Sequence, residues 1–156
     1  MANPETSAPE AAKAVSTDVS ITVKSTDLGP DRYVRGEVYF TYFEQSRLEH
    51  LRRLDIVPKY PPPADAPSYF AIAQTTARYR QPAYFGDTLR VRTTTVDVRN
   101  RSFSLAFEIA RERTGEVLVE GDSVQVWLDE SRRPAPIPPA PRARLETSRL
   151  ATDAAD

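Results

Sequence analysis

Alternating apolar and polar positions predict five strands in this chain. Val19, Ile21 and Val23 alternate with polar residues, which is the period of a half-buried strand. Four later segments have the same character, and we expect strands at 68–80, 87–98, 102–113 and 116–128. A turn at 113–115 makes the last two a hairpin. In the last segment the apolar phase changes at Gly121, which predicts a bulge or a sharp bend there.

One long helix is predicted from Gly36 to about Leu54, because no Gly or Pro interrupts this stretch after Gly36. Its first turns are apolar in almost every direction, so we expect them to be buried, with Phe43 in the core. Its second half carries charges that we expect to emerge into solvent, at Arg47, Glu49, Arg52 and Arg53. His50 is expected to be exposed in this half.

The prolines are gathered in two clusters, one in a linker inside the folded part and one after it. Of 14 prolines, five lie in 58–67 and five in 134–141. Residues 1–17 have almost no large apolar side chain, so we expect a disordered N-terminal tail. Residues 131–156 are expected to be a mostly disordered, Pro-rich tail, with a short helix possible at 142–151. A single domain at 18–130 remains.

Composition excludes several classes of function. The 21 Lys and Arg nearly balance the 22 Asp and Glu, so no positive field favours nucleic acid. Without Cys and with a single His, thiolate nucleophiles and the usual metal sites are excluded, and we expect no metal. The N-terminus has no apolar signal segment and no stretch is long enough to span a bilayer. We expect a soluble, cytoplasmic protein without a membrane partner.

The order of strand, helix and four strands predicts an α+β fold, in which a curved antiparallel sheet wraps round one long central helix. One layer of sheet leaves an open edge and an uncovered face. We therefore expect a homodimer or a larger even oligomer.

Three segments, 26–51, 77–109 and 117–138, resemble the hotdog-fold acyl-CoA thioesterases of the 4-hydroxybenzoyl-CoA thioesterase-like family. The similarity lies in a helix that opens with Tyr39 and continues as Tyr-Phe-Glu-x-x-Arg at 42–47. An Arg-Gln-Pro-x-x-x-Gly-Asp turn follows at 80–87. The resemblance implies a hotdog domain and hydrolysis of an acyl thioester of coenzyme A or of an acyl carrier protein. It also implies a homodimer or homotetramer with sites between subunits, and no cofactor beyond coenzyme A as part of the substrate.

The family's active carboxylate lies in the loop before the helix, ten residues ahead of the Tyr that matches Tyr39. In this chain that position is Gly29. The catalytic candidates are therefore the flanking carboxylates, Asp27 first and Asp31 second, with attack on the carbonyl or activation of water both possible. An Asp in a Gly-Pro loop is more often a turn or capping residue.

The start of the helix supplies the second catalytic element. The backbone amides near Gly36 and Glu37 point along a helix dipole that favours a developing oxyanion. Substrate contacts are expected from Tyr33, Arg35, Tyr39, Glu44 and Arg80. Each also has a structural reading, since tyrosines pack in cores and a Glu and an Arg three apart on a helix commonly form an ion pair.

One other thioesterase mechanism and two other functions fit the same architecture. The segment 36–40 resembles thioesterases of enediyne polyketide assembly. Those enzymes lack the carboxylate and rely on basic groups and backbone hydrogen-bond donors. A non-catalytic acyl-binding or scaffolding protein is favoured by Gly29 in the carboxylate position. A dehydratase or hydratase ranks lower, because it needs a His paired with a carboxylate and His50 lies at the wrong end of the helix.

Overall fold

The computed structural model describes residues 16–57 and 70–149. The strands are β1 (Ser16–Thr22), β2 (Phe70–Tyr79), β3 (Thr88–Val98), β4 (Ser102–Arg111) and β5 (Val117–Trp127). The helices are the short η1 (Ser25–Asp27), the long α2 (Val38–Arg53) and α3 (Pro139–Ser148). Of the tail predicted at 1–17, residues 1–15 lie outside the described residues, as does the proline cluster at 58–67, while residues 16 and 17 belong to β1 and so contradict the prediction.

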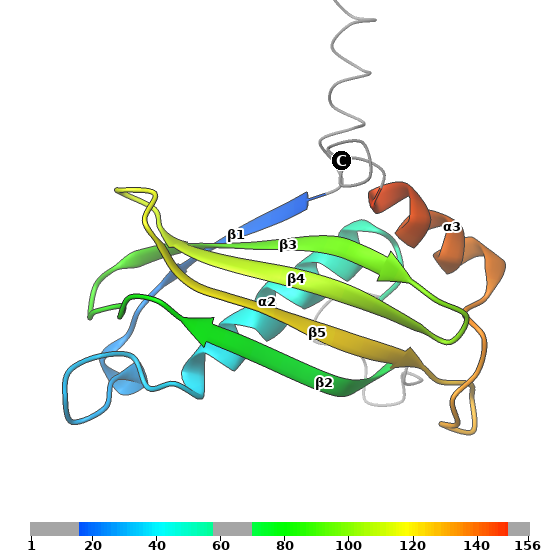
Figure 1. Cartoon of the computed structure of the whole chain (residues 1–156), viewed down its shortest axis with the longest axis horizontal. Helices are drawn as coiled ribbons and strands as arrows, with labels where there is room; N and C mark the ends of the chain where they lie inside the picture. Colours follow the sequence, from blue (N-terminus) through cyan, green and yellow to red (C-terminus); the bar gives the residue numbers. More distant parts are fainter. Residues whose placement is uncertain (1–15, 58–69, 150–156) are drawn as a thin grey trace, which may run out of the picture.

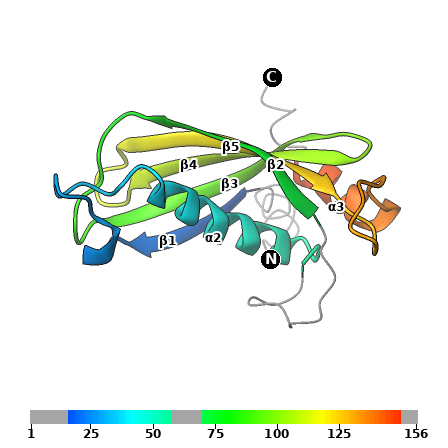
Figure 2. The same cartoon turned by 90° about the horizontal axis from the view of Figure 1, so that it is seen from below.

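The five strands form one antiparallel sheet in the order β1-β3-β4-β5-β2, and α2 lies across one of its faces (Figures 1 and 2). The strand bounds lie within one or two residues of those predicted. The agreement is close because long runs of alternating side chains fit only the period of a strand. The predicted α+β architecture is confirmed. The strands β1 and β2 are the edges of the sheet.

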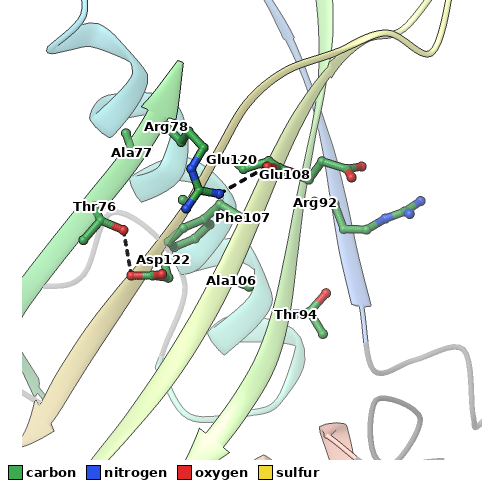
Figure 3. A pocket seen from close by; sticks show the side chains of 11 residues that line it. Thr76, Ala77, Arg78, Arg92, Thr94, Ala106, Phe107, Glu108, Glu120 and Asp122 are labelled. Carbon is green, nitrogen blue, oxygen red and sulfur yellow. Dashed lines mark hydrogen bonds and ion pairs between the residues drawn. The ribbon is translucent and has the colours of Figure 1, made fainter. Parts of the chain in front are cut away.

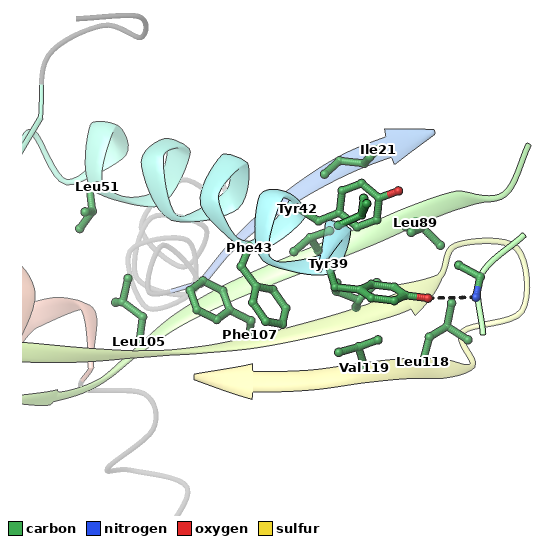
Figure 4. Packing of buried hydrophobic residues seen from close by; sticks show 14 of the residues in the cluster. Ile21, Tyr39, Tyr42, Phe43, Leu51, Leu89, Leu105, Phe107, Leu118 and Val119 are labelled. Carbon is green, nitrogen blue, oxygen red and sulfur yellow. Dashed lines mark hydrogen bonds between the residues drawn. The ribbon is translucent and has the colours of Figure 1, made fainter. Parts of the chain in front are cut away.

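The core forms where α2 meets the middle of the sheet. Phe43 is fully buried, and its ring stacks on Phe107 of β4 with centroids 4.5 Å apart and planes at 11° (Figure 4). Alternate residues of β4 point toward the helix and are buried, as predicted. Phe40, one turn before, remains 37% exposed. Burial of this apolar surface is the main driving force for packing the helix on the sheet.

The bulge predicted at Gly121 is misplaced. Gly121 pairs in regular register with Phe107 on one side and Ala77 on the other, and the irregularity comes earlier, where Val119 pairs with Ile109 but Val117 pairs with Ala110. From Val119 onward the inward positions of β5 continue through Gly121 to two buried polar residues, Ser123 and Gln125, and to Trp127. Polar residues at inward positions made the apolar pattern change phase in the sequence.

Gly121 is required for a different reason, which is close packing. A Cβ atom there would lie 2.4 Å from the carbonyl oxygen of Thr76 and 2.7 Å from two ring carbons of Phe43. Absence of a side chain therefore lets the Phe43 ring reach the sheet.

The predicted exposure of the second half of α2 is wrong for two residues. His50 is fully buried, with Nδ1 2.8 Å from the Thr17 hydroxyl and Nε2 2.8 Å from the Thr95 hydroxyl. Arg47 is also buried, and its guanidinium carbon lies 5.9 Å from the centroid of the Phe107 ring. Both lie on the sheet side of α2, where hydroxyls of β1 and β3 and an aromatic ring of β4 accommodate them.

The C-terminal segment contains a short helix, as the sequence allowed at 142–151, but this helix begins earlier and packs on the domain, unlike the mostly disordered tail expected at 131–156. Pro139–Ser148 forms α3, in which Leu145 is fully buried and the Ser148 hydroxyl lies 2.7 Å from the Thr95 hydroxyl of β3. Prolines suit the first turn of a helix, where no amide donor is needed, so this Pro-rich stretch starts α3 instead of preventing it. The folded domain thus extends beyond 130.

Substitution of Gly121 by Ala should destabilise the protein by about 1–3 kcal/mol, because the new methyl group clashes with backbone that cannot move aside. We expect a lower thermal midpoint in calorimetry. Gly36→Ala is the matched control, since its Cβ would meet nothing closer than 3.5 Å. Equal midpoints for Gly121→Ala and the parent would contradict this packing.

Burial, and then the charge of Arg53, lowers the pKa of His50 from 6.5 to about 4. As the pH falls, His50 of the unfolded chain binds a proton near pH 6.5, whereas His50 of the folded chain binds it only near pH 4. The stability contributed by neutral His50 is therefore fully present above pH 6.5 and is lost as the pH falls from 6.5 toward 4. Between pH 7 and pH 5 this amounts to about 2 kcal/mol. Urea unfolding should show that His50→Gln removes this part of the pH dependence. An identical pH dependence in parent and variant would refute it.

Candidate active site

A pocket of about 330 Å³ opens at the start of α2, between the loop that precedes the helix and the end of β2. We call it the helix-start pocket. It is lined by Asp31, Tyr33, Val34, Gly36, Tyr39, Tyr79, Arg80, Gln81 and Pro82. Five of the nine residues predicted for the site are among them: Asp31, Tyr33, Gly36, Tyr39 and Arg80.

The loop before α2 is held by backbone hydrogen bonds. The Gly29 amide donates to the Tyr33 carbonyl at 2.8 Å and the Arg32 amide donates to Gly29 at 3.0 Å, so this stretch folds back on itself. The Val34 amide donates to the Ala83 carbonyl at 3.0 Å, which fastens the loop to the segment after β2. Residues distant in sequence thereby form one wall of the pocket.

Two tyrosines connect the helix to the edge strand. The Tyr79 hydroxyl donates to the Gly36 carbonyl at 2.9 Å, and the hydroxyl oxygen of Tyr39 accepts from the Ala83 amide at 3.2 Å (Figure 4). Their ring centroids are 5.5 Å apart. Burial raises the pKa of the Tyr39 hydroxyl, which therefore stays protonated at neutral pH.

The amides at the helix start are available to a ligand. Within 16–57 and 70–149, the backbone N–H groups of Gly36 and Glu37 have no acceptor at hydrogen-bond distance. A Cβ on Gly36 would lie 3.5 Å from the Tyr79 hydroxyl oxygen, an ordinary contact distance, so the space beside this amide is open. Unpaired amides at a helix N-terminus attract negative charge. They can bind the oxygen of a polarised carbonyl.

The two candidate carboxylates occupy different surroundings. Asp27 Oδ2 accepts from the Lys24 amide at 3.0 Å and from the Tyr42 hydroxyl at 3.0 Å. Burial and this contact with Asp27 raise the pKa of Tyr42. Asp27 is therefore engaged with η1 and α2, and it is absent from the lining of the helix-start pocket.

Asp31 lies at the pocket wall. Its Oδ1 accepts from the Tyr33 amide at 3.1 Å, which closes a turn and fixes the carboxylate. Its Oδ2 has no hydrogen-bond partner in the part of the chain that the structure describes. A fixed carboxylate with one free oxygen can accept a proton from water.

The remaining predicted residues lie apart from the pocket or at its rim. Glu37 is exposed and pairs with Arg35 at 3.2 Å, so both side chains face solvent. Arg80, which is in the pocket lining, also pairs with Glu120 at 2.8 Å. Glu44 lies on the outer face of α2, where it lines a separate hollow with Thr41 and Leu48. The structure therefore does not bring Glu44 to the helix-start pocket.

Sequence reasoning missed Tyr79 as a site residue. It is the last residue of β2 and precedes Arg80 directly, so its place beside the recognised turn at 80–87 was the available signal. What could not be read from the sequence is that its hydroxyl reaches back to Gly36, 43 residues earlier.

A larger hollow, about 590 Å³, lies on the sheet face opposite α2 (Figure 3). Its charged side chains are paired with neighbours across the strands: Thr76 with Asp122 at 2.8 Å, Arg78 with Glu120 at 3.7 Å and Arg92 with Asp18 at 2.8 Å. None of the predicted site residues lines it. The helix-start pocket is the better candidate for chemistry.

No group of three or more His, Asp or Glu within 16–57 and 70–149 is arranged to hold a metal ion. In the same residues, no helix has the length and apolar character needed to cross a membrane.

Residues 31–145 match the thioesterase-like superfamily, which is about three quarters of the chain. No curated protein matches the sequence. A thioesterase from Thermus thermophilus, solved with coenzyme A and Zn, is similar at 29% identity and a TM-score of 0.74, over 85% of this chain and 92% of that one.

Two solved structures of lower identity share the fold. A 1,4-dihydroxy-2-naphthoyl-CoA thioesterase from Synechocystis is 15% identical, with a TM-score of 0.73 over 83% of this chain and 95% of that one. A 12:0-ACP thioesterase from Umbellularia californica is 19% identical, with a TM-score of 0.73 over 86% of this chain and 50% of that one. The predicted hotdog domain is confirmed.

Proposed function

The chain belongs to the thioesterase-like superfamily, and from this membership and the helix-start pocket we propose that it hydrolyses an acyl thioester with Asp31 as the catalytic carboxylate. The observation that supports this assignment most is the juxtaposition of a carboxylate with a free oxygen and unpaired helix-start amides around one pocket. The substrate is an acyl thioester of coenzyme A or of an acyl carrier protein.

Hydrolysis proceeds by addition of water to the thioester carbonyl. Asp31 accepts a proton as the water oxygen bonds to the carbonyl carbon, and the amides of Gly36 and Glu37 stabilise the oxyanion that forms. Collapse of this intermediate breaks the carbon–sulfur bond, and the proton passes to the leaving thiolate. The products are the free acid and the thiol.

Asp27 acts in this proposal as a positioning residue. Its carboxylate joins η1 to Tyr42 and so holds the loop that carries Asp31. Its Oδ2 accepts both hydrogen bonds, and the residue is absent from the lining of the helix-start pocket, which leaves it a weaker candidate for proton transfer there than Asp31.

Replacing the two aspartates by asparagine separates these roles. Asp31→Asn keeps an oxygen for the Tyr33 amide but cannot accept a proton, so kcat should fall about a hundredfold to ten-thousandfold. Asp27→Asn should retain a larger share of kcat and lose thermal stability. Asp55→Asn, in an exposed turn after α2 with a φ of 57°, is the matched control. Steady-state thiol release measures all three.

Suppose that Asp27→Asn and Asp31→Asn both hydrolyse the thioester at the parent's rate, while Arg35→Ala or Tyr33→Phe is slower. That result would contradict a carboxylate mechanism. The mode without a carboxylate, in which basic groups and backbone donors polarise the carbonyl, would then describe this site.

We also propose that the protein is a homodimer joined through β2. This strand is an edge of the sheet, and within 16–57 and 70–149 it has a partner on one side alone. Ile72 of this strand is 42% exposed and Tyr79 is 51% exposed. Exposed apolar side chains on an unpaired edge strand favour pairing with another chain. A second copy would cover this edge next to the helix-start pocket.

Sedimentation velocity at micromolar concentration should give twice the 17.5 kDa of the chain. Ile72→Lys should weaken this dimer by adding a charge at the edge. Val96→Lys, at an exposed position of β3, should leave it intact. A parent protein that sediments as a monomer would overturn the proposed assembly.

A further inference from the structure

Tyr79 lies where the edge strand β2 ends beside the start of α2 (Figure 1). Its hydroxyl donates to the Gly36 carbonyl at 2.9 Å. A Cβ atom on Gly36 would lie 3.5 Å from the hydroxyl oxygen of Tyr79 and 3.7 Å from the ring carbon that bears it, so the phenol lies directly against the glycine. Within 16–57 and 70–149, this hydroxyl is the one hydrogen-bond donor to the Gly36 carbonyl.

The Gly36 carbonyl and the Glu37 amide belong to the same peptide unit. A peptide unit is planar and trans, so its C=O and N–H bonds point in opposite directions. A donor that fixes the direction of the C=O bond therefore also fixes the direction of the N–H bond. The Glu37 N–H is one of the two amides that stabilise the oxyanion in the mechanism proposed above.

The two oxyanion amides are held in different ways. The Gly36 N–H belongs to the peptide unit of the Arg35 carbonyl, which accepts from the Val38 amide at 2.9 Å. That hydrogen bond is local and forms with the first turn of the helix. In the described residues, the peptide unit of the Glu37 N–H has no backbone donor of this kind, and its carbonyl depends on Tyr79, 43 residues away.

The glycine makes this dependence stronger. Gly36 has no Cβ, so it can adopt backbone conformations that are closed to other residues, and the peptide unit that follows it is freer to rotate. The hydrogen bond from Tyr79 opposes that rotation. A hydrogen bond accepted by the carbonyl also polarises the peptide unit, which makes the Glu37 N–H a stronger donor.

Tyr79 can hold the peptide unit in place because its own position is fixed. Its backbone pairs with Val119 of β5, and the next amide, that of Arg80, donates to the Leu118 carbonyl at 2.8 Å. Its ring lies 5.5 Å from the ring of Tyr39, measured between centroids. The hydroxyl is thus presented to the helix start by a paired strand and a packed ring.

We propose that Tyr79 is a positioning residue for thioester hydrolysis. Its hydroxyl holds the peptide unit between Gly36 and Glu37 so that the Glu37 N–H stays directed out of the start of α2 toward the oxyanion. This inference rests on the proposed function and adds to it a residue that does not touch the reacting atoms. Donors that are already oriented stabilise developing charge without rearrangement, so the hydroxyl should matter more for the transition state than for the bound substrate.

The variant Tyr79→Phe removes the hydroxyl and keeps the ring. We expect kcat for thiol release to fall about tenfold with KM nearly unchanged, which is less than the loss of about a hundredfold or more when a whole oxyanion donor is removed. Tyr84→Phe is the matched control and should keep the parent's kcat. Tyr84 is 43% exposed against 51% for Tyr79, and within 16–57 and 70–149 its hydroxyl makes no hydrogen bond. Sedimentation velocity checks that both variants keep the parent's assembly.

Two further measurements separate positioning from a general loss of structure. A trifluoromethyl ketone analogue of the thioester forms a tetrahedral hydrate that resembles the transition state, whereas the methyl ketone binds as a carbonyl. Tyr79→Phe should weaken binding of the first about tenfold and leave binding of the second unchanged. In isotope-labelled protein, the Glu37 amide proton should resonate further upfield in Tyr79→Phe than in the parent, because the peptide unit is less polarised.

Equal weakening of both ketones, or a higher KM with the parent's kcat, would overturn the inference while leaving thioester hydrolysis intact. So would the parent's kcat in Tyr79→Phe, or a Glu37 amide resonance that does not move. A parent protein that releases no thiol would instead refute the proposed function, and the positioning role of Tyr79 would be refuted with it. Activity of the parent therefore distinguishes the two failures.

Discussion

The stacking of Phe43 on Phe107 determines where α2 lies on the sheet. Because Gly121 has no side chain, the Phe43 ring reaches the sheet and stacks at 4.5 Å on β4. This contact sets the depth of the helix, and the first turn of α2 then lies beside the end of β2. The hydrogen bond from Tyr79 to Gly36 forms there, and it places one wall of the helix-start pocket. A bulkier residue at 121 would act on the pocket through the core.

The same end of the domain distinguishes two carboxylates that are four residues apart. Asp27 receives its hydrogen bonds from a backbone amide and a buried tyrosine, so its charge is used to hold the loop. Asp31 receives one from its own turn and lines the helix-start pocket, from which Asp27 is absent. Location relative to the helix-start pocket, more than position in the chain, therefore decides which carboxylate is suited to catalysis.

Much of the fold could be predicted because strands of ten or eleven residues with alternating side chains allow few interpretations. The failures came where polar residues are buried. Ser123 and Gln125 at inward positions hid the register of β5, and His50 is buried because hydroxyls on β1 and β3 satisfy its ring nitrogens. Such partners are distant in sequence, so a single chain read by itself does not reveal them.

The candidate site could be predicted only in part, because some of its contacts also join residues that are distant in sequence. Local motifs located the loop and the helix start, but Tyr79 and the separate place of Glu44 depend on how α2 crosses the sheet. Thiol release from acyl-CoA thioesters of increasing chain length, measured with the full chain, tests the proposed chemistry most directly. We expect catalytic turnover, with one free acid formed for each thiol. Saturable binding of acyl-CoA without release of thiol would contradict it and would make the protein an acyl-binding hotdog domain.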